Sequence, residues 1–253
     1  MVAAIPVSKA TEIRDILSSF IDNSEQISEF DIKRYDREIS RLPHPFEKDE
    51  LKAFLLAAQG KNDDAIAQFE RAIRMHAEYS TICNFCIFLK RINRMYEAKQ
   101  AYCMYHRWFD DYQMLSSALA FLGYSGDVDG VELCTKKLIG ILGQDSEECS
   151  KVIDIRNEFI DLYGLAEKNS QLSLADIDKL TNVALKVADN HKVPHTDSQF
   201  VFADSTLAFI ISVKNQSSDK LADLNIDASF ALADNDDLLG KNVSVVFRDV
   251  LDN

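Results

Sequence analysis

Three short groups of residues in this chain have types and spacings that could do chemistry. Cys83-Asn84-Phe85-Cys86 is a CxxC pair, which serves redox chemistry at a helix N-terminus or binds zinc together with a second ligand pair. His191 and His195 are four residues apart, as two metal ligands on one helix face would be. The run Asp234-Asn235-Asp236-Asp237 offers the oxygen ligands that calcium prefers.

None of these groups is predicted to form a reactive site. Cys86 falls at a recurring small position of a helical pattern, so we expect a structural core cysteine. Pro194 breaks any helix that would align the two histidines, which we interpret as linker residues. The acidic run lacks the glycine and the glutamate of an EF-hand loop, so a solvated loop is expected. The chain also has no P-loop, GxGxxG, GxSxG or HExxH motif.

Composition points to a helical protein with an acidic surface. Glycine (8) and proline (4) are scarce among 253 residues, which favours helices over a turn-rich β fold. The net charge of −13 argues against nucleic acid or an anionic membrane as partner. The five cysteines lack the spacing of a disulfide framework, and the start of the chain has no basic region; both features predict a cytoplasmic protein. Because no apolar run reaches about 18 residues, no membrane span is expected.

A helix–turn–helix pattern recurs along the first half of the chain. Turn chemistry at 60–63 is followed by Ala65 and Phe69 on one helix face, and the small–large pair returns as Ala98 with Tyr102. Further matching positions are Gly130 and Cys134 in a third copy, and, in the preceding helices, Ala53, Cys86 and Ala118 at a small position and Leu56, Leu89 and Phe121 at a large one.

This pattern, over residues 46–142, resembles the tetratricopeptide repeat, a helix–turn–helix unit of about 34 residues. The resemblance implies a mainly α fold, an α-solenoid of stacked hairpins, whose first helices line a concave partner-binding groove. The groove-facing positions are then Glu50, Phe54 and Ala57 in the first copy, Cys83, Ile87, Lys90 and Arg91 in the second, and Tyr112, Leu115 and Leu119 in the third. Such a groove suits an amphipathic helix or an extended peptide with an acidic end; the alternative is that the N-terminal helices or the C-terminal segment cover it.

The remaining segments flank this repeat region. Helices expected at 8–22 and 26–42 cap the stack within an N-terminal region, 1–45, and helices from about 145 to 164 and from 173 to 190 complete a repeat domain, 46–190, as a fourth hairpin. Alternating apolar residues after a boundary at 191–195 predict a small antiparallel β domain, 198–253. Its third strand, within 221–233, also fits a helical period, so helix stays open there.

These features predict a non-enzymatic protein–protein interaction module, an adaptor, regulator or partner-specific chaperone, with no cofactor and no metal. The alternatives are an antitoxin or immunity-type protein that neutralises a basic toxin or effector, which the negative charge favours, and an enzyme with a scattered site between helices and sheet. The small β segment must lean on the helices, pair with a second copy as a homodimer, or bind a partner, because a free sheet of this size buries little.

Overall fold

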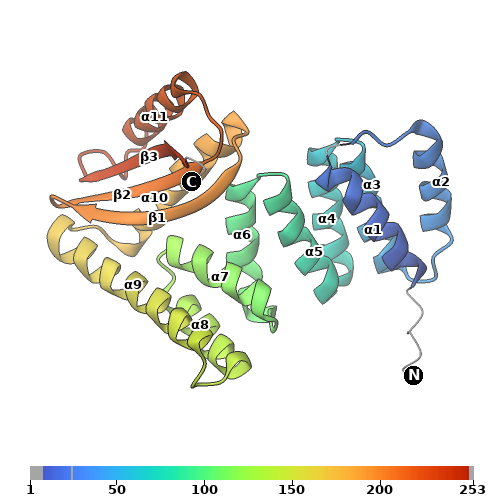
Figure 1. Ribbon diagram of the computed structural model, residues 1–253, viewed down its shortest axis with the longest axis horizontal. Coiled ribbons are helices and arrows are strands. Elements are labelled where there is room, and N and C mark those ends of the chain that lie inside the picture. The colour runs from blue at the N-terminus through green and yellow to red at the C-terminus, as the bar shows by residue number, and fades with distance from the viewer. Residues whose placement is uncertain (1–7, 24, 251–253) are drawn as a thin grey trace. The chain divides into compact units, whose positions relative to one another are not determined.

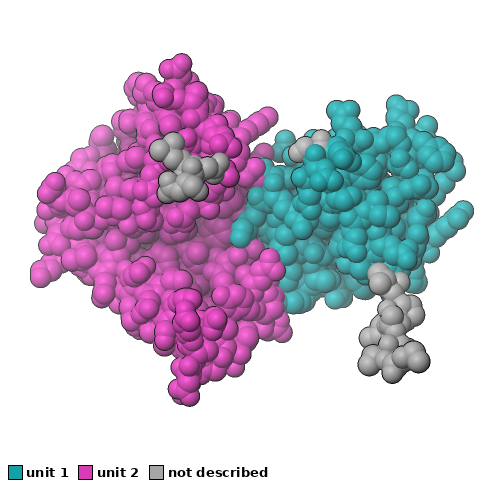
Figure 2. Space-filling model, viewed as in Figure 1, with its two compact units in different colours: residues 1–92 teal, residues 93–253 magenta. Residues whose placement is uncertain are grey.

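The computed structural model describes residues 8–23 and 25–250, which form two compact units, residues 1–92 and 93–253 (Figure 2). The division falls inside the second predicted repeat. The first seven residues, which belong to the start of the chain where the sequence lacks a basic region, lie outside the described residues.

The first unit consists of helices joined by short turns. Its elements are α1 (Lys9–Asp22), α2 (Glu29–Ser40), α3 (Pro45–Ala58), α4 (Asn62–His76) and α5 (Tyr79–Arg91). The side chains of Ser8 and Ser28 cap α1 and α2 by accepting from backbone N–H groups, so both helices begin close to where the sequence predicts them. Gly60, with φ +75°, makes the turn between α3 and α4, a conformation that strains other residues.

The core of the first unit is built by the predicted small–large pattern. Ala65 and Phe69 of α4 are fully buried, and the Phe69 ring meets the ring of Phe54 edge to face at 5.3 Å. The same ring lies 5.5 Å from Phe85 and 5.2 Å from Phe88 of α5. Phe69 therefore joins α3, α4 and α5, and such aromatic contacts stabilise beyond the area they bury.

The second unit combines helices with a sheet (Figure 1). Its elements are α6 (Met95–Tyr105), the 3-10 turn η1 (His106–Trp108), α7 (Tyr112–Tyr124), α8 (Val128–Leu142), α9 (Glu147–Ser170), α10 (Leu174–His191), β1 (His195–Ala203), β2 (Thr206–Val213), α11 (Ser218–Ala233) and β3 (Val243–Asp249). The chain is thus mainly helical with a small sheet near its C-terminal end.

Sequential helices of the second unit pack as neighbours: α6 on α7, α7 on α8 and α8 on α9. Ala98 and Tyr102 are buried in α6, and Gly130 and Cys134 are buried in α8, at the places the repeat pattern gives them. A Cβ at Gly130 would lie 2.7 Å from Leu122 Cδ2 of α7, which explains why the smallest residue stands there. α10 packs on α6 and α11 rather than along α9, so within the described residues the predicted fourth hairpin is wrong.

The sheet has the order β1-β2-β3 and is mixed. β1 and β2 pair antiparallel, with Phe200 opposite Phe209, as predicted for a hairpin. β2 and β3 pair parallel, with Ile211 opposite Phe247, so the prediction of an all-antiparallel sheet is wrong. The reason is the segment between them: a crossover helix returns the chain to the starting end of β2, whereas a hairpin turn would reverse it.

The segment 218–233 forms this crossover helix, α11, so the strand predicted within 221–233 is wrong and the helical alternative is correct. Ser217 caps the helix by accepting from Lys220 N. The side chain of Asn225 donates to Phe247 O at 3.0 Å and accepts from Phe247 N at 2.9 Å, so it ties α11 to the backbone of β3. One face of the sheet packs with α9, α10 and α11 in a shared hydrophobic core.

Candidate functional site

In the first unit, the predicted groove position Glu50 holds a buried charge. The Glu50 side chain is 1% exposed, and its carboxylate accepts from Arg14 Nε of α1 at 2.8 Å. Thr81 Oγ1 and Asn84 Nδ2, both from α5, donate to the same carboxylate at 2.7 and 3.0 Å. Glu50 therefore links α1, α3 and α5, and its carboxylate binds to groups of its own unit.

A cavity of about 320 Å³ lies between α1, α3 and α5. Among the predicted groove residues, Phe54, Ile87 and Arg91 line it, and Phe54 is only 3% exposed. Arg91 Nε lies 3.5 Å from Asp22 Oδ1 at the end of α1. In this unit an N-terminal helix thus lies over the face that the resemblance assigns to the groove. Of the three remaining positions, Ala57 is buried, Cys83 is partly buried and Lys90 is exposed.

In the second unit, a cleft lies between α7 and α9. Its volume is about 240 Å³, and we call it the α7–α9 cleft. The residues that line it are Tyr112, Ser116, Leu119, Ala120, Glu148, Lys151, Val152 and Ile155. Tyr112 and Leu119 are two of the predicted groove positions, whereas Leu115, the third from this copy, is fully buried and belongs to the core.

The side of the cleft contributed by α9 was not among the predicted groove residues. Val152 and Ile155 lie on the apolar face that the sequence predicts for this helix. That apolar face was the feature of the sequence from which their place in the cleft could have been predicted. The groove was predicted from the three recognisable repeats only, so the prediction did not include α9, the helix that forms the second side of the cleft.

The surface of the α7–α9 cleft is mostly apolar and partly open to solvent. Tyr112 is 47% exposed and Ile155 is 41% exposed, while Leu119 and Val152 beneath them are buried. Ser116 Oγ is buried and has no hydrogen-bond partner within the described residues. An unsatisfied buried hydroxyl is costly, so a group that bonds to it from the cleft would be favoured.

None of the cysteines and histidines first singled out for chemistry lines either cavity. Cys86 is fully buried, and burial raises the pKa of its thiol. His191 Nε2 contacts Asp227 Oδ2 at 2.6 Å, whereas His195 Nε2 contacts the hydroxyl of Ser198 at 2.7 Å, so the two histidines serve different contacts. Within residues 8–23 and 25–250, no cluster of His, Cys, Asp or Glu could hold a metal ion.

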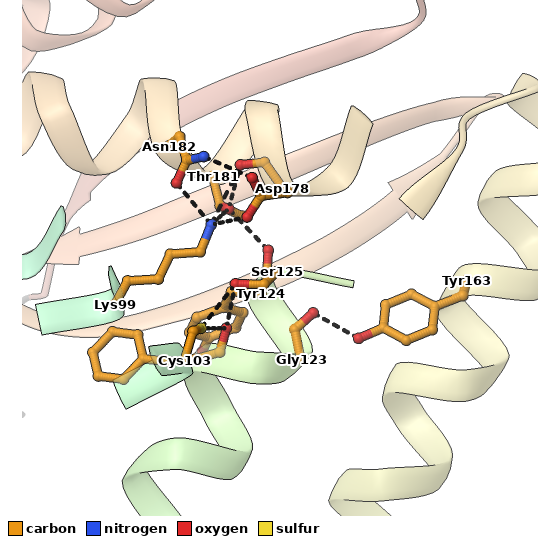
Figure 3. A network of polar contacts seen from close by, with 10 residues as sticks. Lys99, Cys103, Gly123, Tyr124, Ser125, Tyr163, Asp178, Thr181 and Asn182 are labelled. Carbon is orange, nitrogen blue, oxygen red and sulfur yellow. Dashed lines mark hydrogen bonds and ion pairs between the residues drawn. The ribbon is translucent and has the colours of Figure 1, made fainter. Parts of the chain in front are cut away.

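A buried lysine joins α6 to α10 (Figure 3). Lys99 Nζ, with no exposed side-chain surface, donates to Asp178 Oδ1 at 2.8 Å, Thr181 Oγ1 at 2.6 Å and Asn182 Oδ1 at 2.9 Å. Thr181 Oγ1 in turn donates to Tyr124 O of α7 at 2.9 Å. Burial lowers the pKa of Lys99, and the nearby Asp178 carboxylate acts against that shift. Every Lys99 donor is occupied by protein, so we interpret this cluster, the Lys99 network, as structural.

A half-buried carboxyl pair, Asp189 and Glu97, lies at the start of α6. Asp189 of α10 accepts from the backbone N–H groups of Met95 and Tyr96, each at 2.9 Å, and so caps α6 from another helix. Burial, and to a lesser extent the neighbouring Glu97, raise the pKa of Asp189 to about 7 against the lowering effect of these two hydrogen bonds. Burial also acts to raise the pKa of Glu97, but its hydrogen bond from Arg94 lowers it.

A scan against protein-family models gave no match to this chain, and searches of curated proteins and of solved structures gave no significant match either. Across the described part of the chain, no helix combines the length and apolar character needed to span a membrane.

Proposed function

We propose that this chain is a non-enzymatic interaction module, an adaptor, regulator or partner-specific chaperone, that binds a peptide or helix of a partner protein through the α7–α9 cleft. The observation that carries the proposal is the set of exposed apolar side chains around a buried, unpartnered Ser116 hydroxyl. The repeat register and the packing of sequential helices support the further proposal that these hairpins belong to a tetratricopeptide-like solenoid.

The size of the cleft favours a side-chain anchor over a small-molecule substrate. Sites for small molecules usually enclose about 300–1,000 Å³. The α7–α9 cleft, at about 240 Å³, falls below that range and is open on one side. It is therefore better matched to one or two apolar side chains presented by a partner helix, with a polar group near Ser116. Such anchors commonly supply about 2 kcal/mol or more of binding free energy each.

The test compares two isoleucines of the same helix. Ile155 lines the cleft and is 41% exposed, whereas Ile153, 38% exposed, does not line it. Affinity capture from the native host, quantified by mass spectrometry, should yield a stoichiometric partner with the wild-type chain. Ile155→Asp should reduce its recovery by about tenfold or more, because a charge would enter an apolar contact.

Ile153→Asp is the matched control and should leave recovery unchanged. Circular dichroism should show that both variants keep the wild-type helix content. Equal recovery of the partner with Ile155→Asp and with Ile153→Asp would exclude the cleft as the binding site.

A second proposed function is neutralisation of a basic toxin or effector, in the manner of an antitoxin or immunity protein. The net charge of −13 supports it, because opposite charge accelerates association at long range. Once a partner is isolated, its association rate should fall steeply as salt is added. A rate that does not depend on salt would contradict this second function and leave the first intact.

A further inference from the structure

The outward face of α11 carries an apolar pair where a surface helix normally carries polar residues. Ile226 is 53% exposed and Phe230 is 66% exposed, one helical turn apart. On the opposite face, Leu224 and Ala228 are fully buried against the rest of the unit. Leu224 and Ala228 therefore anchor the helix, and the exposed side chains of Ile226 and Phe230 do not contribute to its packing.

Aspartates surround this apolar pair. Asp219 and Asp223 share the outward face with Ile226 and Phe230 by helical spacing, and Asp234 follows as the C-cap. These three carboxylates have no ion-pair partner within the described residues. The basic residue of this helix, Lys220, instead points its ammonium at His191 Nδ1, 2.8 Å away. The face is thus both acidic and apolar.

We propose that this face, defined by Ile226, Phe230, Asp219, Asp223 and Asp234, is a docking surface for a cationic segment of a partner protein. The apolar side chains of that segment would cover Ile226 and Phe230, and its lysines or arginines would pair with the aspartates. Charge decides among the occupants. A second copy of this chain would bring aspartates against aspartates, and an anionic lipid surface would be repelled in the same way.

This docking surface is separate from the α7–α9 cleft and does not depend on it. A random peptide library displayed on phage is selected against the full chain. The affinities of the enriched peptides are then measured by fluorescence anisotropy. We expect peptides rich in Lys or Arg together with Leu or Phe. They should bind Phe230→Ser at least about tenfold more weakly than the wild type. Asp219→Asn with Asp223→Asn should weaken binding most at low salt, since salt screens exposed charges.

Two controls make the outcome decisive. Ile141→Ser removes a side chain that is 47% exposed on α8, where no aspartate lies in the last two turns, and should leave the affinities unchanged. Ile155→Asp should also leave them unchanged. The proposal is overturned if the enriched peptides bind Phe230→Ser as tightly as the wild type, or if they lack basic residues. Loss of binding with Ile155→Asp alone would overturn it while supporting the α7–α9 cleft.

Discussion

The Lys99 network gives the most demanding test of how the second unit is held together. Lys99→Met keeps an unbranched side chain as far as Cε but deletes a buried ammonium and its bonds to Asp178, Thr181 and Asn182. Hydrogen bonds to a charged group contribute about 1.5–3 kcal/mol each, whereas keeping an ammonium out of water costs several kcal/mol. The two effects oppose each other, so the sum of the three bonds overstates the loss.

The surroundings of the lysine decide the balance. The Asp178 side chain is 38% exposed, so water can solvate its charge once the lysine is gone. Thr181 keeps its bond to Tyr124 O, and Asn182 keeps its bond to Asp178 Oδ2 at 2.8 Å. We therefore expect Lys99→Met to lower the free energy of unfolding by about 2 kcal/mol, less than the 3–5 kcal/mol typical of a broken buried pair. For a unit of this size, that corresponds to a fall in Tm of about 4–8 °C.

Urea unfolding followed by the fluorescence of Trp108 measures this change. Trp108 is the one tryptophan of the chain and lies in the second unit, so its signal reports that unit. Lys151→Met is the control, because Lys151 pairs with Glu147 on the surface and its loss should cost less than about 1 kcal/mol. A Lys99→Met variant as stable as the wild type, or more stable, would show that desolvation outweighs the bonds and would refute the reasoning.

Two further perturbations test the same unit by Trp108 fluorescence. Because the pKa of Asp189 is raised from 3.8 to about 7, its protonated form stabilises the fold below about pH 4, and this contribution is lost as pH rises through 7. The urea midpoint of the wild type should therefore fall relative to Asp189→Asn between pH 5 and 8; parallel pH profiles would contradict it. A Cβ at Gly123 would overlap the ring of Phe159, so Gly123→Ala should destabilise by about 1–3 kcal/mol, whereas exposed Gly140→Ala should stabilise by up to about 1 kcal/mol.

The parts of the fold that the sequence predicts correctly are those fixed by local pattern. Ala65 and Phe69 share a helix face by spacing alone, and the turn before them needs a glycine, so the α3–α4 hairpin follows from the local pattern within residues 45–76. The environment of Glu50 is different in kind. Its partner Arg14 is 36 residues away, and no local pattern indicates that α1 lies over this face. A carboxylate predicted to face a partner is therefore found bound inside its own unit.

The error at α11 has a physical cause that bears on function. Ile226, Ala228, Phe230 and Leu232 alternate as in a strand because α11 carries apolar residues on two faces, an inward one at Ala228 and an outward one at Ile226 and Phe230. A helix that only covered the sheet would have polar residues at those outward positions, and its period would be unambiguous. Ile226 and Phe230, which make the sequence of this helix resemble a strand, are thus the same side chains that lie exposed among aspartates in the fold. Replacing them with serine should make the period plainly helical and leave the fold intact, while removing the docking surface.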